Sequence, residues 1–265
     1  MNAVILIPAR YASSRYPGKA LVELKGSSGT LKPLIQRSVE AARRVAGVSG
    51  VFVVTDDERI AEACAPARVG VIMTSTECRN GTERCAEALP QLHEPDLVIN
   101  FQGDALLTPP SFVEALIARM ESDPDALVAT PAMRLRSEEL AGLRREEAAG
   151  RVGGTTVVTD SRGHALYFSK RLIPHLPQWG AEAEPTPMML HVGVYAYRPR
   201  ALELYRDTPQ SELEILEGLE QLRFLDAGMP IAVVEVETPP FALRELNNPE
   251  DVAPIEEALA AAGLE

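Results

Sequence analysis

Cysteine is scarce in this sequence, and its placement excludes two common uses of the residue. Cys64, Cys78 and Cys85 are odd in number, and no CxxC pair occurs among them. A disulfide framework needs paired cysteines, and a zinc site usually contains closely spaced ones, so neither is indicated. We therefore expect three free, buried or inert thiols.

Basic residues are also few. The chain has 26 Lys and Arg against 38 Asp and Glu, which gives a formal net charge of −12. Nonspecific binding to a nucleic-acid backbone needs a basic face, so the balance argues against a nucleic-acid partner. Any local cluster of cations stands out against this acidic background.

Long hydrophobic runs are missing as well, so no segment is expected to span a membrane. The first residues, Met1–Pro8, form too short an apolar run and have no basic leader, which favours a strand over a signal peptide. With 265 residues and 46% hydrophobic composition, the chain can bury a sizeable core. We expect a cytoplasmic protein with a single domain.

Short apolar runs alternate with longer helical patterns in the first half of the chain. This rhythm is typical of β-α units, so we expect an α/β fold with a Rossmann-like, mostly parallel sheet covered on both faces. The expected strands are Ala3–Pro8, Val51–Thr55, Gly70–Met73 and Leu97–Phe101, and the expected helices are Leu34–Val45, Asp57–Cys64, Gly81–Leu92 and Pro110–Met120.

From about Ala126 the pattern loosens into a smaller, β-rich region. The prolines between Pro174 and Pro187 indicate an irregular excursion that includes Trp179. A helix is expected to follow Asn248, a plausible cap. The expected strands are Val128–Leu135, Thr155–Val158, Ala165–Phe168, His191–Tyr197 and Ile231–Val236, and the expected helices are Glu212–Leu225 and Pro249–Ala261.

Three cations follow the first expected strand in a short loop. Arg10, Arg15 and Lys19 would lie at the carboxyl end of the sheet, where open α/β folds bind ligands. Arg can fork two phosphate oxygens and Lys adds a compact charge, so the mixture suits a polyphosphate. Gly18 would allow the backbone to approach it closely.

A second candidate follows the strand Leu97–Phe101. Asp104 comes directly after it, and Gly103 allows a sharp turn. A carboxylate there can hold Mg²⁺, which is usually bound by one or two carboxylates together with substrate phosphates. An aspartate after a strand is also commonly just a turn cap, but the cationic loop nearby favours the metal.

These segments, with further blocks, resemble the CMP-Kdo synthetases, the cytidylyltransferases that activate 3-deoxy-manno-octulosonate (Kdo). The resemblance implies a homodimer that transfers CMP from CTP, with Mg²⁺, to a small anionic acceptor and releases pyrophosphate. The matching blocks are Pro8-Ala9-Arg10, Ser13–Lys19, Met73-Thr74-Ser75, Asn80–Arg84, Gln102-Gly103-Asp104, Gly163–Lys170, His191–Arg198 and Leu219–Arg223.

The resemblance also assigns roles to residues. The expected catalytic residues are Arg10, Arg15, Lys19 and Asp104, and the expected nucleotide-binding residues are Ala9, Ser14, Thr74, Ser75, Asn80, Gly81, Arg84 and Gln102. The base-reading part makes physical sense, because a helix starting at Gly81 and Thr82 offers free amide groups close to Arg84. By contrast, the acids of Thr55–Ile60 lie at an expected helix start, where they favour the helix dipole, and are interpreted as mainly structural.

The second half of the chain is expected to bind the acceptor and to form the dimer. A histidine in a strand such as His191 is also often a purely structural group. The expected acceptor residues are Lys170, His191, Tyr195, Glu220 and Gln221. The expected division is 1–125 for CTP, 126–210 for acceptor and dimer contacts, and 211–265 for a closing α/β part.

The chain departs from the family pattern at several positions. Asn247 stands where the family has the Asp that serves as its second metal ligand; we expect it to offer a neutral carbonyl oxygen and hence to weaken metal binding. Ala105, Lys170 and Thr156 replace the usual Glu, Arg and Lys. Two alternatives to a Kdo enzyme therefore stay open: CMP transfer to a small phosphonate such as phosphonoformate, and nucleotide binding without transfer.

Overall fold

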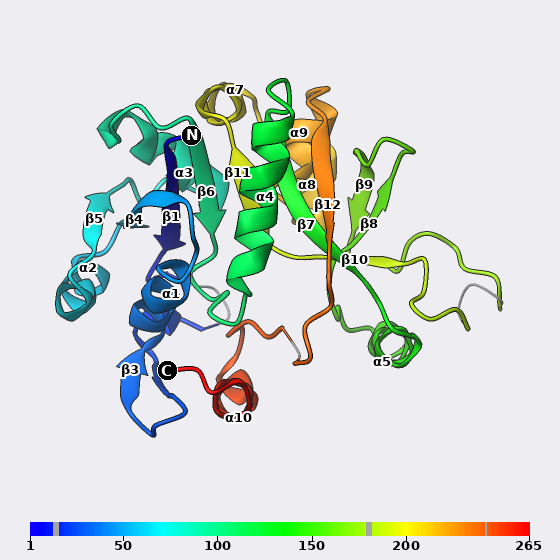
Figure 1. Cartoon of the computed structure of the whole chain (residues 1–265), viewed down its shortest axis with the longest axis horizontal. Helices are drawn as coiled ribbons and strands as arrows, with labels where there is room; N and C mark the ends of the chain where they lie inside the picture. The colour runs from blue at the N-terminus through cyan, green and yellow to red at the C-terminus, as the bar shows by residue number, and fades with distance from the viewer. Residues whose placement is uncertain (13–15, 179–181, 242) are drawn as a thin grey trace.

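The structure is a computed structural model that describes residues 1–12, 16–178, 182–241 and 243–265. Its first half builds parallel strands joined by helices (Figure 1). β1 (Ala3–Ala9) pairs with β4 (Val48–Thr55) and β6 (Leu97–Phe101), and β5 (Gly70–Met73) pairs with β4. The helices are α1 (Leu34–Ala42), α2 (Glu58–Cys64), α3 (Gly81–Ala88) and α4 (Pro110–Ser122). The predicted Rossmann-like half is confirmed, with ends that shift by a few residues.

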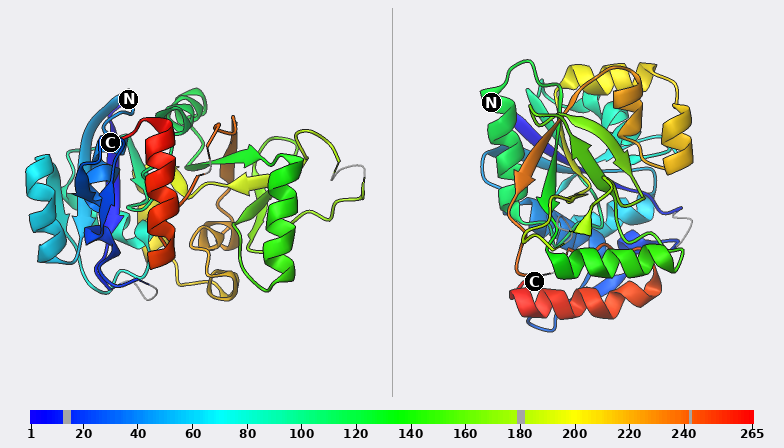
Figure 2. Two further views of the ribbon diagram at one scale, coloured as in Figure 1. Left: turned by 90° about the horizontal axis from the view of Figure 1, so that it is seen from below. Right: turned by 90° about the vertical axis from the view of Figure 1, so that its right-hand side faces the viewer.

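The second half continues the same sheet with mainly antiparallel strands. They are β7 (Val128–Arg134), β8 (Thr156–Thr159), β9 (Ala165–Ser169), β10 (Met189–His191), β11 (Val194–Tyr197) and β12 (Ile231–Val236). The sheet order is β5-β4-β1-β6-β11-β7-β10-β8-β9, and β12 runs parallel to β7 off this path. Figure 2 shows the parallel half at one end of the molecule and β8 and β9 at the other. The α/β fold class is confirmed, while the three-part division of the chain stays a prediction.

Several elements were not predicted. They are the hairpin of β2 (Glu23–Lys25) and β3 (Leu31–Pro33), and the helices α5 (Ser137–Ala148) and α7 (Pro199–Asp207). The expected closing helix is divided into a 3₁₀ turn, Pro249–Asp251, and α10 (Val252–Ala262). Asn248 does cap this turn, through a reciprocal capping box with Asp251.

The strand expected over His191–Tyr197 is interrupted. His191 in β10 pairs with Ala132 of β7, and Ala196 in β11 pairs with Ala129 of β7. The step from His191 to Ala196 is therefore two residues longer than the matching step along β7, and these extra residues form a bulge. The local sequence reads as one strand, and only the pairing reveals the bulge. Bulges re-aim the chain beside active sites, and here Gly193 reaches the cleft described below.

The helix expected over Glu212–Leu225 is also broken. α8 (Glu212–Glu217) ends at Gly218, whose φ of 59° is the left-handed conformation that glycine adopts freely, and α9 (Leu222–Asp226) follows. Glu220 and Gln221 therefore lie in the turn between two short helices rather than on a helix face.

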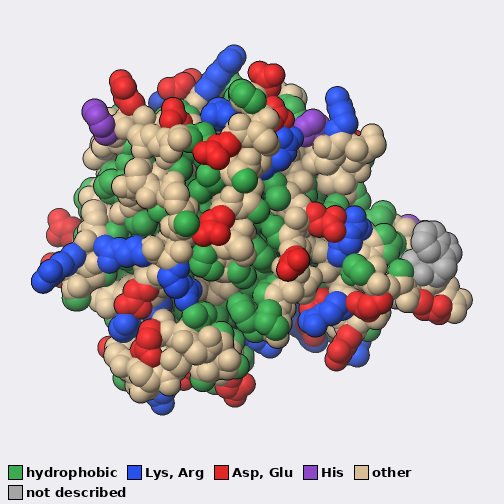
Figure 3. All heavy atoms as spheres, viewed as in Figure 1, with side chains coloured by type: hydrophobic (Ala, Val, Ile, Leu, Met, Phe, Trp, Pro, Cys, Tyr) green, Lys and Arg blue, Asp and Glu red, His purple; other side chains and the backbone are tan. Residues whose placement is uncertain are grey.

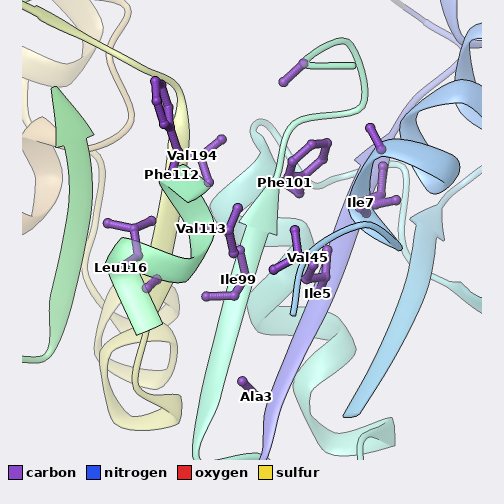
Figure 4. Packing of buried hydrophobic residues seen from close by; sticks show 14 of the residues in the cluster. Ala3, Ile5, Ile7, Val45, Ile99, Phe101, Phe112, Val113, Leu116 and Val194 are labelled. Atoms are coloured by element: carbon purple, nitrogen blue, oxygen red, sulfur yellow. The ribbon is translucent and has the colours of Figure 1, made fainter. Parts of the chain in front are cut away.

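Two hydrophobic layers hold the sheet between the helices. Alternate residues of β1 point to opposite faces: Ile5 packs with residues of α1, α2 and α4, and Leu6 packs with residues of α3, α7 and α9. Figure 4 shows part of the first layer, with Ile5, Ile99 and Val113 close together. No helix in the described ranges is both long and apolar enough to cross a bilayer.

Candidate functional site

A cleft of about 1210 Å³ opens at the carboxyl ends of β1 and β6 and extends to β10, β11 and the turn after α8. Its lining includes most of the residues predicted from the sequence. They are Ala9, Arg10, Lys19, Asn80, Gly81, Arg84, Gln102, Asp104, Lys170, His191, Tyr195, Glu220, Gln221 and Asn247. Thr74 and Ser75 do not line the cleft but bond to Arg84, which does. Ser14 and Arg15 fall outside the described residues. The structure thus brings the candidates together, while their individual roles stay predictions.

Lys19 and Asp104 form an ion pair at the end of the cleft where the strands β1 and β6 finish. The Lys19 ammonium donates to Asp104 Oδ2, and also to the carbonyl oxygen of Leu246 at 3.2 Å. This one side chain therefore connects the loop after β1, the loop after β6 and the segment that carries Asn247. Asp104 and Asn247 both line the cleft, and their oxygens are the donor type that Mg²⁺ prefers.

Gly103 allows the loop after β6 to pass close to β1. A Cβ at this position would lie 2.7 Å from the carbonyl oxygen of Pro8, a contact with backbone that cannot relax easily. The predicted sharp turn thus has a steric cause: only glycine lets the backbone carry Asp104 past the end of β1.

Arg84, which lines the cleft, is the buried centre of a polar cluster. Its guanidinium donates to Thr74 Oγ1, to the Ser75 carbonyl at 3.4 Å and to Asp56 Oδ2 at 3.1 Å, and the residue is only 2% exposed. The acidic residues of the Thr55–Ile60 segment therefore have different roles. Asp57 caps α2 as expected, whereas Asp56 holds Arg84, a role that sequence reasoning missed.

The start of α3 is more fully bonded than the sequence suggested. Asn80 Oδ1 accepts from the Glu83 amide at 2.8 Å, and Glu220 Oε2 accepts from the Thr82 amide at 3.0 Å. Side chains therefore already satisfy the amide groups of Thr82 and Glu83, so the expectation of free amide groups at this helix start is wrong for Thr82. Gln102 Nε2 also donates to Glu220 at 3.3 Å. Burial raises the pKa of Glu220 despite these donors.

Two aromatic rings contact His191 in the part of the cleft that is predicted to bind the acceptor. Its ring centroid lies 5.0 Å from that of Phe168 and 5.4 Å from that of Tyr195, and its Nε2 is 2.9 Å from Thr130 Oγ1. Burial lowers the pKa of His191 to about 3, so the imidazole is neutral near pH 7. A neutral His191 can bind an acceptor by a hydrogen bond but contributes no positive charge.

Lys170 and Gln221 border the same half of the cleft. Lys170 Nζ lies 2.8 Å from where a Cβ of Gly218 would be, so the glycine that ends α8 also leaves room for this cation. Gln221 is 2% exposed, and its Nε2 has no hydrogen-bond partner among the described residues. An unpaired buried donor is costly, and a ligand oxygen in the cleft would satisfy it.

Charge on the surface is mixed. Figure 3 shows acidic and basic side chains interspersed over one face rather than gathered into a broad basic surface. The three cysteines are free and buried, as expected, and burial raises the pKa of Cys64 to about 11 and that of Cys78 to about 12. No thiol is therefore poised as a nucleophile.

The parallel sheet, the cations after β1 and the carboxylate after β6 define a nucleotidyltransferase-type site. A family model described as cytidylyltransferase matches residues 4–231, so the chain belongs to the cytidylyltransferase family. It is 40% identical to the 3-deoxy-manno-octulosonate cytidylyltransferase of Maricaulis maris (strain MCS10) over 99% of both chains. It is 37% identical to the 8-amino-3,8-dideoxy-manno-octulosonate cytidylyltransferase of Shewanella piezotolerans over 98% of this chain and 99% of the relative.

A solved structure is also similar over almost the whole chain. The CMP:2-keto-3-deoxy-manno-octonic acid synthetase complexed with CTP superimposes with a TM-score of 0.84 and 36% identity, covering 99% of this chain and all of that one. The predicted resemblance is confirmed.

Proposed function

We propose that this protein transfers CMP from CTP to a Kdo-type sugar acid and releases pyrophosphate. The observation that carries the proposal is one cleft that joins Arg10, Lys19 and Asp104 at the strand ends to Lys170 and His191 on the acceptor side. Support also comes from relatives of matching length whose names specify Kdo or its 8-amino derivative.

The transfer needs positioning and charge neutralisation rather than a protein nucleophile. A hydroxyl oxygen of the acceptor attacks the α-phosphorus in line and releases its proton to solvent. The bond from this phosphorus to the bridging oxygen of the β-phosphate breaks, and pyrophosphate leaves with the electron pair. Arg10 and Lys19 would neutralise the leaving phosphates, and we propose the same role for Arg15.

Mg²⁺ is the proposed cofactor, held by Asp104 and Asn247. A metal bound by one carboxylate, one amide oxygen and the phosphates fits the usual habit of this ion. When bound, it would neutralise charge on the triphosphate. In this structure the same carboxylate is paired with the Lys19 ammonium, so a bound metal would have to share or replace this contact.

The first test is pyrophosphate release from CTP and Mg²⁺ with Kdo, 8-amino-Kdo, a sialic acid and simple phosphonates as acceptors. Release with Kdo or its amino derivative supports the proposal, and their ratio identifies the acceptor. Release only with a phosphonate would instead favour the phosphonate enzyme. CTP binding without turnover of any acceptor would favour a nucleotide-binding protein that lacks transferase activity.

Asn247→Asp tests whether the neutral side chain weakens the metal site. A second carboxylate adds negative charge beside Asp104, so we expect the Mg²⁺ concentration for half-maximal activity to fall about tenfold. The measurement is a Mg²⁺ titration of the initial rate at fixed CTP, with Asn248→Asp as the matched control on the neighbouring residue. Loss of activity in Asn247→Asp, with unchanged folding, would mean that the amide itself has a required role.

We also propose that the protein forms a homodimer through α8. Leu213, Ile215 and Leu216 are 40%, 64% and 73% exposed, a cluster of aliphatic side chains that a second copy would cover. Ile215 also lines the cleft, so a partner there would border the acceptor side. We expect the unchanged protein to elute as a dimer in light-scattering chromatography and Ile215→Glu/Leu216→Glu to be monomeric. A monomer in the unchanged protein at micromolar concentration would overturn this proposal.

A further inference from the structure

The loop between the two cleft cations is closed by its own backbone. The Gly18 amide donates to the Tyr11 carbonyl oxygen at 2.8 Å, which draws the two ends of the loop together. Arg10 comes directly before this closure and Lys19 directly after it. The geometry of the Tyr11–Gly18 closure therefore affects the spacing between the two cations that are proposed above to bind the triphosphate.

The Tyr11 ring fixes this closure from one side. A Cβ at Gly18 would lie 3.1 Å from the ring, and the φ of Gly18 is 74°, so glycine alone lets the backbone pass there without strain. The Tyr11 ring also packs against the core layer formed with α1, α2 and α4. The ring thus connects the loop to the body of the protein.

Arg59 of α2 covers the same ring. Its Cζ lies 3.4 Å from the centroid of the Tyr11 ring, and its guanidinium is oriented by Asp57, which accepts from Nε at 2.9 Å and from Nη2 at 2.6 Å. The Arg59 side chain is 57% exposed, so packing in the hydrophobic core does not explain its position. The two hydrogen bonds to Asp57 fix the orientation of the Arg59 guanidinium, and the Tyr11 ring lies against its face, so the contact is rigid.

We infer that Tyr11 and Arg59 are positioning residues that hold Arg10 and Lys19 at the spacing needed to bind the triphosphate of CTP. Neither is among the residues that line the cleft, so they act through the loop and not on the ligand. The inference rests on the proposed function. Because Arg59 reaches the loop only through the Tyr11 ring, removing Arg59 should add no further loss once Tyr11 has been replaced.

The experiment measures CTP binding and steady-state kinetics for Tyr11→Leu, Arg59→Ala and the double variant. We expect each single variant to raise Kd and KM for CTP about tenfold and to leave KM for the acceptor unchanged. The double variant should bind CTP no more weakly than the single variant with the larger loss of affinity. Tyr11→Phe keeps the ring and should retain most of the affinity. Arg59→Lys keeps the charge but loses the two hydrogen bonds to Asp57, so it should retain only part of the affinity. Arg43→Ala is the matched control, because Arg43 is an exposed arginine that binds the carbonyls of Ala67 and Arg68 just after α2.

The outcomes are separable. If the unchanged protein binds CTP, and Arg59→Ala and Tyr11→Leu bind it equally tightly, this inference alone is overturned. No CTP binding by the unchanged protein overturns the inference and the proposed function together. Equal losses for CTP and acceptor, or an equal loss in Arg43→Ala, would indicate general loosening of the fold and would also overturn it. Arg59→Ala keeps the backbone bond from Arg59 to Asp57, so the α2 cap survives.

Discussion

Replacing Asp104 with asparagine will lower the rate of pyrophosphate release from CTP by about 1000-fold, because the site loses the carboxylate that we propose binds Mg²⁺ beside the phosphates. The asparagine is close in shape, so the loop and the Gly103 turn stay in place. The measurement is the initial rate at saturating acceptor over a range of Mg²⁺ concentrations. Asp96→Asn is the control, because Asp96 lies just before β6, at the end of the strand opposite Asp104. Its carboxylate accepts from the backbone amide of Asn2 at 2.7 Å.

The ion pair with Lys19 offers a second explanation for such a loss, and one further variant separates the two. If Asp104 served only to hold Lys19, Lys19→Met would be as damaging as Asp104→Asn, and combining them would add nothing. If Asp104 holds the metal and Lys19 the phosphates, the combination is worse than either. Activity of Asp104→Asn within threefold of the unchanged protein at low Mg²⁺ would contradict both roles.

The sequence was enough to predict where β1 and β6 end, and hence which residues meet there. β1 and β6 are buried on both faces and appear as continuous apolar runs, so their ends were predictable within a residue or two. Adjacent parallel strands end at the same edge of a sheet, which is why Lys19 and Asp104 could be expected to meet.

The parts that could not be predicted depend on contacts between distant segments. Asp56 and Arg84 are 28 residues apart, and an ion pair between two elements leaves no periodic pattern in the sequence. The bulge before β11 exists only in the pairing with β7. The break at Gly218 did have a local signal, a glycine inside an amphipathic pattern, but the amphipathic pattern alone favoured one continuous helix.

Arg223→Ala will destabilise the protein by about 3–5 kcal/mol, the usual cost of leaving a buried charge without its partner. Arg223 is 1% exposed and donates to both carboxylate oxygens of Glu214 at 2.7 Å, and to Glu83 Oε1 at 2.9 Å. The alanine would leave Glu214, itself 4% exposed, as an uncompensated carboxylate. The measurement is the free energy of unfolding from urea titration. Arg206→Ala, which breaks an exposed pair with Asp207, is the control and should cost less than about 1 kcal/mol.

The same substitution should reach the cleft through α3. The Arg223 guanidinium stacks on the Tyr205 ring at 3.9 Å, and the Tyr205 hydroxyl accepts from Asn80 Nδ2 at 3.0 Å, so the arginine braces the residue that caps the start of α3. Glu214→Gln in the Arg223→Ala background removes the buried charge and should recover part of the lost stability. It should not restore CTP affinity, since the brace on Tyr205 and Asn80 is still missing. Recovery of both together would mean that Arg223 affects nucleotide binding only through overall stability.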